Sequence, residues 1–98
     1  MRILAVHQTP SLNQQRYQEV VRRLTGGKDR IEAASDLPFE GLLAHGAGQT
    51  PSGFVVFDIF ASERAVEDFR AAVGTSALDV GIAEPPVFFP AVSAYVTR

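Results

Sequence analysis

The segment from Gly41 to Phe60 places the strongest constraint on the fold, because it contains two strand-like runs on either side of a turn signal. If residues 50–53 form the turn, Thr50 pairs with Gly53, and the same register places His45 directly opposite Asp58. An imidazole and a carboxylate then face each other among apolar neighbours. Burial and charge pairing both perturb the pKa values of such groups, so this hairpin predicts a pocket.

Hydrophobic spacing predicts six elements in the order strand, helix, strand, strand, helix, strand. Strands are expected at about 2–7, 41–48, 54–60 and 87–96, with helices after N-caps at Ser11 and Ser62 that end at Gly26 and Gly74. This order predicts an α+β, ferredoxin-like fold with an antiparallel sheet in strand order 4-1-3-2. We expect the third strand between the first and second, parallel to the first and antiparallel to the second. That arrangement would bring His7 close to His45 and Asp58.

Alternation along the strands divides the sheet into two apolar faces. The face expected under the helices carries Leu4, Val6, Leu42, Ala44, Val55, Phe57, Ile59, Phe88 and Val92. The opposite face would carry Ile3, Ala5, His7, Leu43, His45, Phe54, Val56, Asp58, Phe60, Phe89 and Tyr95. This second face is too apolar to stay in water, and no other segment is long enough to cover it. We therefore expect a two-fold homodimer in which a second copy covers it and encloses an aromatic cavity.

Composition narrows the class of protein. The chain has 98 residues, of which 46% are hydrophobic, and this is enough for one small domain spanning residues 1–98. A net charge of -2 and scattered arginines provide no basic field for nucleic acid. The absence of cysteine excludes disulfides and thiolate chemistry and fits a reducing cytoplasm. No apolar run has the length of a membrane span or a secretory signal, so a cytoplasmic protein without membrane contact is expected.

The whole chain, and most clearly GLLAHGAG and GFVVFDIFASERAVEDF, resembles small bacterial members of the dimeric α+β barrel superfamily. That superfamily includes antibiotic-biosynthesis-monooxygenase-like proteins, haem-degrading enzymes, lactone isomerases, stress-response proteins and members without an assigned activity. The resemblance implies the fold and a homodimer more than any one reaction. The haem-degrading members use an Asn, Trp and His set, and this chain has no Trp. No cofactor is expected.

These observations lead to a hypothesis of a cofactorless, monooxygenase-like enzyme or a binder of a small apolar or aromatic molecule. His45 would act as the base on a phenol or an enolisable carbon, with Asp58 orienting it. His7 or Tyr95 would hydrogen-bond the substrate oxygen. The rings of Phe54, Phe60 and Phe89, together with Tyr95, would bind the substrate.

Two alternatives stay open at this point. One is a non-catalytic structural or stress-response-type dimer whose sheet face is only an interface. Another is a 2-His-1-carboxylate metal site formed by His7, His45 and Asp58, although their spacing matches no metal motif. Tyr17 is expected to be a helix residue that packs on the sheet with its hydroxyl at the rim.

Overall fold

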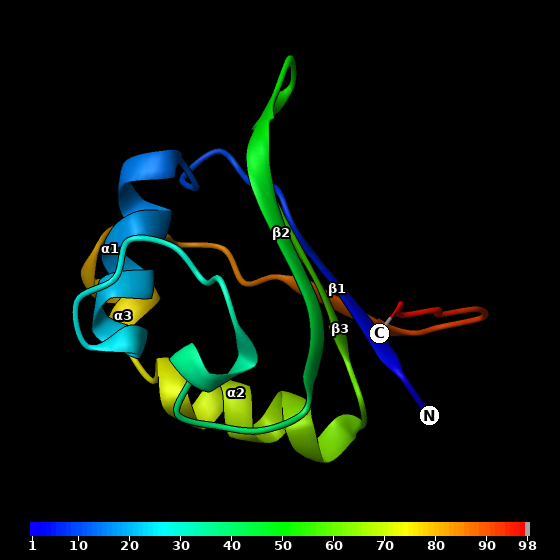
Figure 1. The fold of residues 1–98 in the computed structure, drawn as a ribbon. Coiled ribbons are helices and arrows are strands. Elements are labelled where there is room, and N and C mark those ends of the chain that lie inside the picture. Colours follow the sequence, from blue (N-terminus) through cyan, green and yellow to red (C-terminus); the bar gives the residue numbers. More distant parts are fainter. Residues whose placement is uncertain (98) are drawn as a thin grey trace.

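The computed structural model describes residues 1–97 and shows one four-stranded sheet with helices on one side of it (Figure 1). The elements are β1 (Ile3–His7), α1 (Gln14–Thr25), the 3-10 turn η1 (Ala34–Asp36), β2 (Leu42–Thr50), β3 (Gly53–Phe60), α2 (Glu63–Val73), α3 (Ser76–Asp79) and β4 (Val87–Pro90). The strand order is β2-β3-β1-β4, which is the predicted order written from the other edge. The α+β, ferredoxin-like arrangement is therefore confirmed.

The direction of β3 corrects one detail of the prediction. We expected β3 to run parallel to β1, but β3 pairs antiparallel with both β1 and β2. The reason is topological: the crossover through α1 leaves β1 and β2 pointing the same way, and the tight hairpin then reverses β3. All the strand pairs of the sheet are antiparallel.

The two faces of the sheet are exchanged relative to the prediction. Ile3, Ala5 and Phe60 form a buried cluster with Ala65 and Val66 of α2, so the helices cover the face on which we expected a partner subunit. The face that we assigned to the helices is the uncovered one. We call it the outer face; it carries Leu4, Val6, Val55, Phe57, Ile59, Val87 and Phe89.

Several residues depart from this exchange of faces. Phe89, which we expected on the face of His45, pairs with Leu4 and lies on the outer face. Leu42 and Phe88 do lie on the helix-covered side, since both pack against the buried cluster around Phe60. A register shift between Leu42 and Ala44 moves Leu42 across, and Phe88 is placed by its pairing with Ala5. Val92, which we had also assigned to the helix-covered face, follows β4 and is fully exposed.

The hairpin has the predicted register. Thr50 pairs with Gly53 and His45 pairs with Asp58 across β2 and β3. Asp58 is also opposite Ala5 of β1, which places its carboxylate near the centre of the sheet. The pair therefore lies on the helix-covered face, inside the subunit.

The start of α1 differs from the prediction, whereas that of α2 agrees with it. The side chain of Asn13, and not that of Ser11, caps α1 by accepting a hydrogen bond from the Arg16 amide. Ser11 instead bonds Glu84. Ser62 caps α2 by accepting from the Ala65 amide, as expected, and Gly74 ends that helix.

The last strand is shorter than predicted. It ends at Pro90, so Tyr95 lies in an irregular segment beyond it. Pro90 pairs with Ile3 in this edge strand, where its missing N–H costs no ladder bond, and the Ala91 amide still donates to the Arg2 carbonyl before the chain leaves the sheet. Among residues 1–97, none of the helices has the length and hydropathy needed to traverse a bilayer.

Candidate functional site

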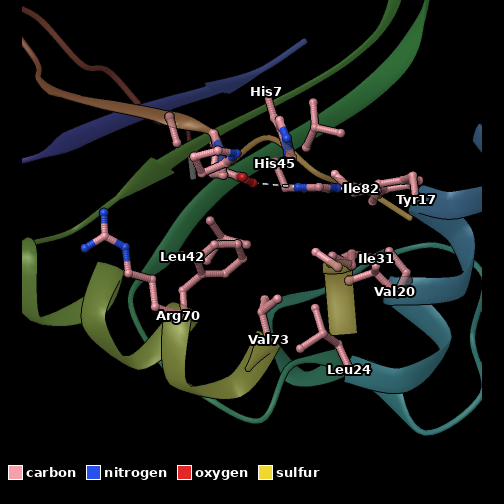
Figure 2. A pocket seen from close by; sticks show the side chains of 18 of the residues that line it. His7, Tyr17, Val20, Leu24, Ile31, Leu42, His45, Arg70, Val73 and Ile82 are labelled. Carbon is pink, nitrogen blue, oxygen red and sulfur yellow. Dashed lines mark hydrogen bonds and ion pairs between the residues drawn. The ribbon is translucent and has the colours of Figure 1, made fainter. Parts of the chain in front are cut away.

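A cavity of about 370 Å³ lies between the helix-covered face of the sheet and the helices (Figure 2). Most of its lining is aliphatic or aromatic and comes from α1, α2, the strands and the segments that follow η1 and α3. The polar and charged side chains that line it are His7, Tyr17, His45, Asp58 and Arg70. A concave, mainly apolar site with a few convergent polar groups is the usual form of a small-molecule pocket.

Asp58, His45 and Tyr17 form a continuous hydrogen-bonded chain in this cavity. His45 Nδ1 lies 2.6 Å from Asp58 Oδ1, and His45 Nε2 lies 2.5 Å from the Tyr17 hydroxyl. A carboxylate can only accept, so we assign the proton of the ring to Nδ1, and the Tyr17 hydroxyl then donates to Nε2. Asp58 thus fixes both the tautomer and the orientation of the imidazole, with Tyr17 at its far nitrogen.

The elements on which these residues lie explain why they meet. His45 and Asp58 are paired across neighbouring strands, and Tyr17 projects from the side of α1 that faces the sheet. The Tyr17 and His45 rings are nearly coplanar, with an interplanar angle of 11° and centroids 5.9 Å apart, and they meet end to end through their hydrogen bond. The Tyr17 ring also contacts Phe54 at 5.3 Å between centroids. The hydrogen bond to His45 and the contact with Phe54 therefore hold the phenol in place.

Burial and the charge of Asp58 both act on the phenol. Burial of the Tyr17 side chain, followed by the negative charge of Asp58, raises the pKa of Tyr17 to about 12. Both effects disfavour the phenolate, because it would be poorly solvated and close to a second negative charge. At neutral pH Tyr17 is consequently a neutral hydroxyl that can donate to His45 and accept from a ligand.

His7 lines the same cavity but takes no part in this chain. Its Nε2 lies 2.7 Å from the carbonyl oxygen of Glu84. The Glu84 carboxylate accepts a 2.5 Å hydrogen bond from the hydroxyl of Ser11, which lowers the pKa of Glu84. The Ala83 amide in turn donates to the Ser11 oxygen. Ser11, which we had expected to cap α1, therefore fixes the 83–86 segment beside His7.

The aromatic residues predicted to bind substrate lie elsewhere. Phe54 and Phe60 are buried in two separate parts of the core, and neither lines the cavity. Phe89 lies on the outer face, and Tyr95 is 82% exposed. The rings that do line the cavity, besides Tyr17, are Phe39, Phe69 and Phe88. Phe54 and Phe60 thus share the face of Asp58 but pack into the core, and the predicted aromatic set does not gather around the cavity.

The metal alternative does not match the arrangement. Within residues 1–97, His, Asp and Glu side chains form no group of three or more placed to hold a metal ion. Both nitrogens of His45 are hydrogen-bonded, and His7 Nε2 is directed to the Glu84 carbonyl. The three residues thus share a cavity without forming a ligand set.

Sequence reasoning missed two of the polar residues of the site. Tyr17 was expected to place its hydroxyl at the rim, and Arg70, which is exposed on α2, was not among the candidate site residues. One sequence signal did point to Tyr17: it lies on the same stripe of α1 as Val20, Val21 and Leu24 but ends in a hydroxyl. A hydroxyl on the side of a helix that faces the sheet needs a hydrogen-bond partner there, and His45 of the hairpin supplies it.

No protein-family model, no curated protein and no solved structure matches this chain.

Proposed function

We propose that the protein binds a small apolar or aromatic molecule in the cavity and transfers a proton to or from it through Tyr17, His45 and Asp58. The chain of two short hydrogen bonds in an apolar cavity is the observation that carries this proposal. An imidazole oriented by a carboxylate is a general base, and an apolar surrounding makes its interaction with a ligand stronger.

The proton path follows from the hydrogen bonds. As an acidic C–H or O–H of the ligand gives its proton to the Tyr17 oxygen, the Tyr17 proton moves to His45 Nε2. The imidazolium so formed is stabilised by Asp58, and the ligand is left as an enolate or phenolate. Tyr17 returns to its neutral form in the same step, which suits a phenol whose pKa is about 12.

A monooxygenase-like activity, as the resemblance implies, would begin with this same proton removal. The electron-rich ligand anion would then reduce dioxygen, which is the oxidant of that second step. Proton transfer is the part that the geometry supports, and it can be tested without oxygen.

The test measures proton exchange on a bound carbon acid. We use tetralone, a bicyclic aromatic ketone with an exchangeable C–H beside its carbonyl, and follow deuterium incorporation by NMR under nitrogen. We expect His45→Gln and Tyr17→Phe to slow the catalysed exchange by about 100-fold or more, since a positioned base contributes about 10² to 10⁴. Tyr95→Phe removes the same hydroxyl group far from the cavity and is the matched control.

Three outcomes would contradict the proposal in different ways. If the wild type binds tetralone but exchanges its proton no faster than buffer does, proton transfer is refuted and only the binding role is left. If tetralone does not raise the melting temperature of the wild type, the binding role is refuted as well. Equal exchange in wild type and His45→Gln would assign the catalysis to other groups.

We also propose a homodimer, now formed through the outer face. Val6, Phe57, Phe89 and Val87 are 38%, 47%, 40% and 64% exposed, and the helices lie on the other side of the sheet (Figure 1). Exposed apolar surface of this kind is typical of an interface. The Phe57 ring also lies over Gly46, where an added β carbon would be 2.6 Å from it, so the face carries an aromatic ridge.

The oligomeric state tests this interface directly. We expect Phe57→Lys to convert a dimer into a monomer in sedimentation experiments, because a charge would be buried without a partner. Leu78→Lys, at a 66% exposed leucine of α3, is the matched control and should leave the dimer intact. A monomeric wild type would refute the dimer. This interface is also what the non-catalytic alternative requires, so it does not decide whether the cavity is used.

A further inference from the structure

Arg70 is the single Lys or Arg side chain among the residues that line the cavity in the described part of the chain. It projects from the last turn of α2, and its guanidinium carbon lies 4.5 Å from the centre of the Phe88 ring, which lines the same cavity. Figure 2 shows Arg70 and Tyr17 on opposite sides of the pocket, one from α2 and the other from α1. The cavity thus has a cationic end, where Arg70 is exposed to solvent, and a hydroxyl side at Tyr17.

The guanidinium of Arg70 is free to bind a ligand. Within residues 1–97 it has no carboxylate within ion-pair distance, and the neighbouring acid Asp68 is paired with Arg64 instead. A cation–π contact with Phe88, with the guanidinium carbon 4.5 Å from the ring centre, holds the cation in place. Its N–H groups remain available to a ligand, and their fork geometry matches a carboxylate.

The negative and positive side chains of the cavity lie at opposite ends of it. Asp58 brings a negative charge to the Tyr17 and His45 side, where it repels an anion, whereas Arg70 attracts one on the other side. A ligand with one anionic end would therefore bind in one orientation only. Its uncharged end would be presented to Tyr17.

We propose that Arg70 is the anion-recognising residue of the cavity and that the ligand is an amphipathic organic acid. Its carboxylate binds the edge of Arg70, and its apolar body fills the space between the helices and the sheet. This inference rests on the proposed function, since it assigns a ligand class to the same cavity. It also places the atom that exchanges its proton at the end of the ligand away from the carboxylate.

The experiment compares two probes of the same shape. Naphthoate carries the carboxylate, and naphthamide replaces it by an uncharged amide; the affinity of each is measured by calorimetry. Chemical shifts of the Val20, Val73 and Leu24 methyl groups, which line the cavity, show whether a probe is bound there. We expect the wild type to bind naphthoate more tightly than naphthamide, with a preference that weakens as salt is added.

Arg70→Gln should lower the affinity for naphthoate about tenfold, which is the effect of losing one charge-assisted contact, and leave naphthamide within about twofold. Arg64→Gln removes the same charge from the same helix outside the cavity and should change neither affinity. The inference is overturned if Arg70→Gln weakens both probes equally or neither. If neither probe shifts the cavity methyl groups of the wild type, the proposed function fails as well, so the two failures are distinguishable.

Discussion

The titration of Tyr17 tests the hydrogen-bonded chain most sharply. Burial and the charge of Asp58 raise its pKa from 10.0 to about 12, with burial the larger cause. Between these two values the folded protein keeps a proton that the unfolded chain has released. Stability is therefore complete below pH 10 and is lost as the pH rises toward 12.

The size of this loss can be bounded. A shift of two pKa units corresponds to about 2.7 kcal/mol at 1.36 kcal/mol per unit. Because Tyr17 is only partly buried, solvent screening reduces the effect, and we expect a decrease of about 1 kcal/mol in the free energy of unfolding. Asp58→Asn removes the smaller cause and keeps the burial, so the pKa of Tyr17 should fall but stay above 10.0.

The chain is well suited to this measurement, since it contains two tyrosines and no tryptophan. In the Tyr95→Phe variant, the absorbance of tyrosinate reports on Tyr17 alone, and circular dichroism at each pH verifies that the protein is still folded. A midpoint at 10.0 in the folded protein would refute the burial of the phenol. An unchanged midpoint in the variant that also carries Asp58→Asn would refute the contact with the carboxylate.

Three further substitutions test how the fold positions the site. Gly41→Ala should lower the free energy of unfolding by about 2 to 4 kcal/mol, because φ is +97° and the new β carbon would lie 2.5 Å from the β carbon of Ala65 in α2. Gly48→Ala is the control: Gly48 has open space around it and no positive φ, so the variant should be neutral or slightly stabilised in the same denaturant experiment. Ser62→Ala should cost about 1 kcal/mol through the lost helix cap, and an unchanged unfolding midpoint would contradict that role. Ser11→Ala should raise the pKa of Glu84 toward 4.5, as followed by NMR of its carboxyl carbon; no change would show that the Ser11 contact does not hold this carboxylate.

The hairpin could be predicted because its information is local. A turn at residues 50–53 determines the whole register, and this register places His45 opposite Asp58. The element order predicted the strand order in the same way, because short connections and right-handed crossovers leave few alternatives.

The face covered by the helices could not be predicted by the same reasoning. Alternation determines which residues share a face, but both faces of this sheet are apolar, so the pattern does not indicate which one the helices cover. The contact between Tyr17 and His45 depends on that choice and on where α1 crosses the sheet. Arg70 was missed for a related reason: on α2 it resembles any other exposed charge, and only its position over Phe88 places it at the cavity.

The exchange of faces changes what the His45 and Asp58 pair can do. Had the pair been on the outer face, any substitution of it would have affected the interface and the pocket together. In the structure the pair is inside the subunit, and the outer face is on the other side of the sheet, so binding and assembly should be separable. We expect His45→Gln to slow tetralone exchange by about 100-fold or more while leaving the proposed dimer intact.

Conversely, Phe57→Lys should yield a monomer that still binds naphthoate, and the double variant should show both effects additively. A monomeric His45→Gln protein would contradict this separation and would return the pair to a role in assembly.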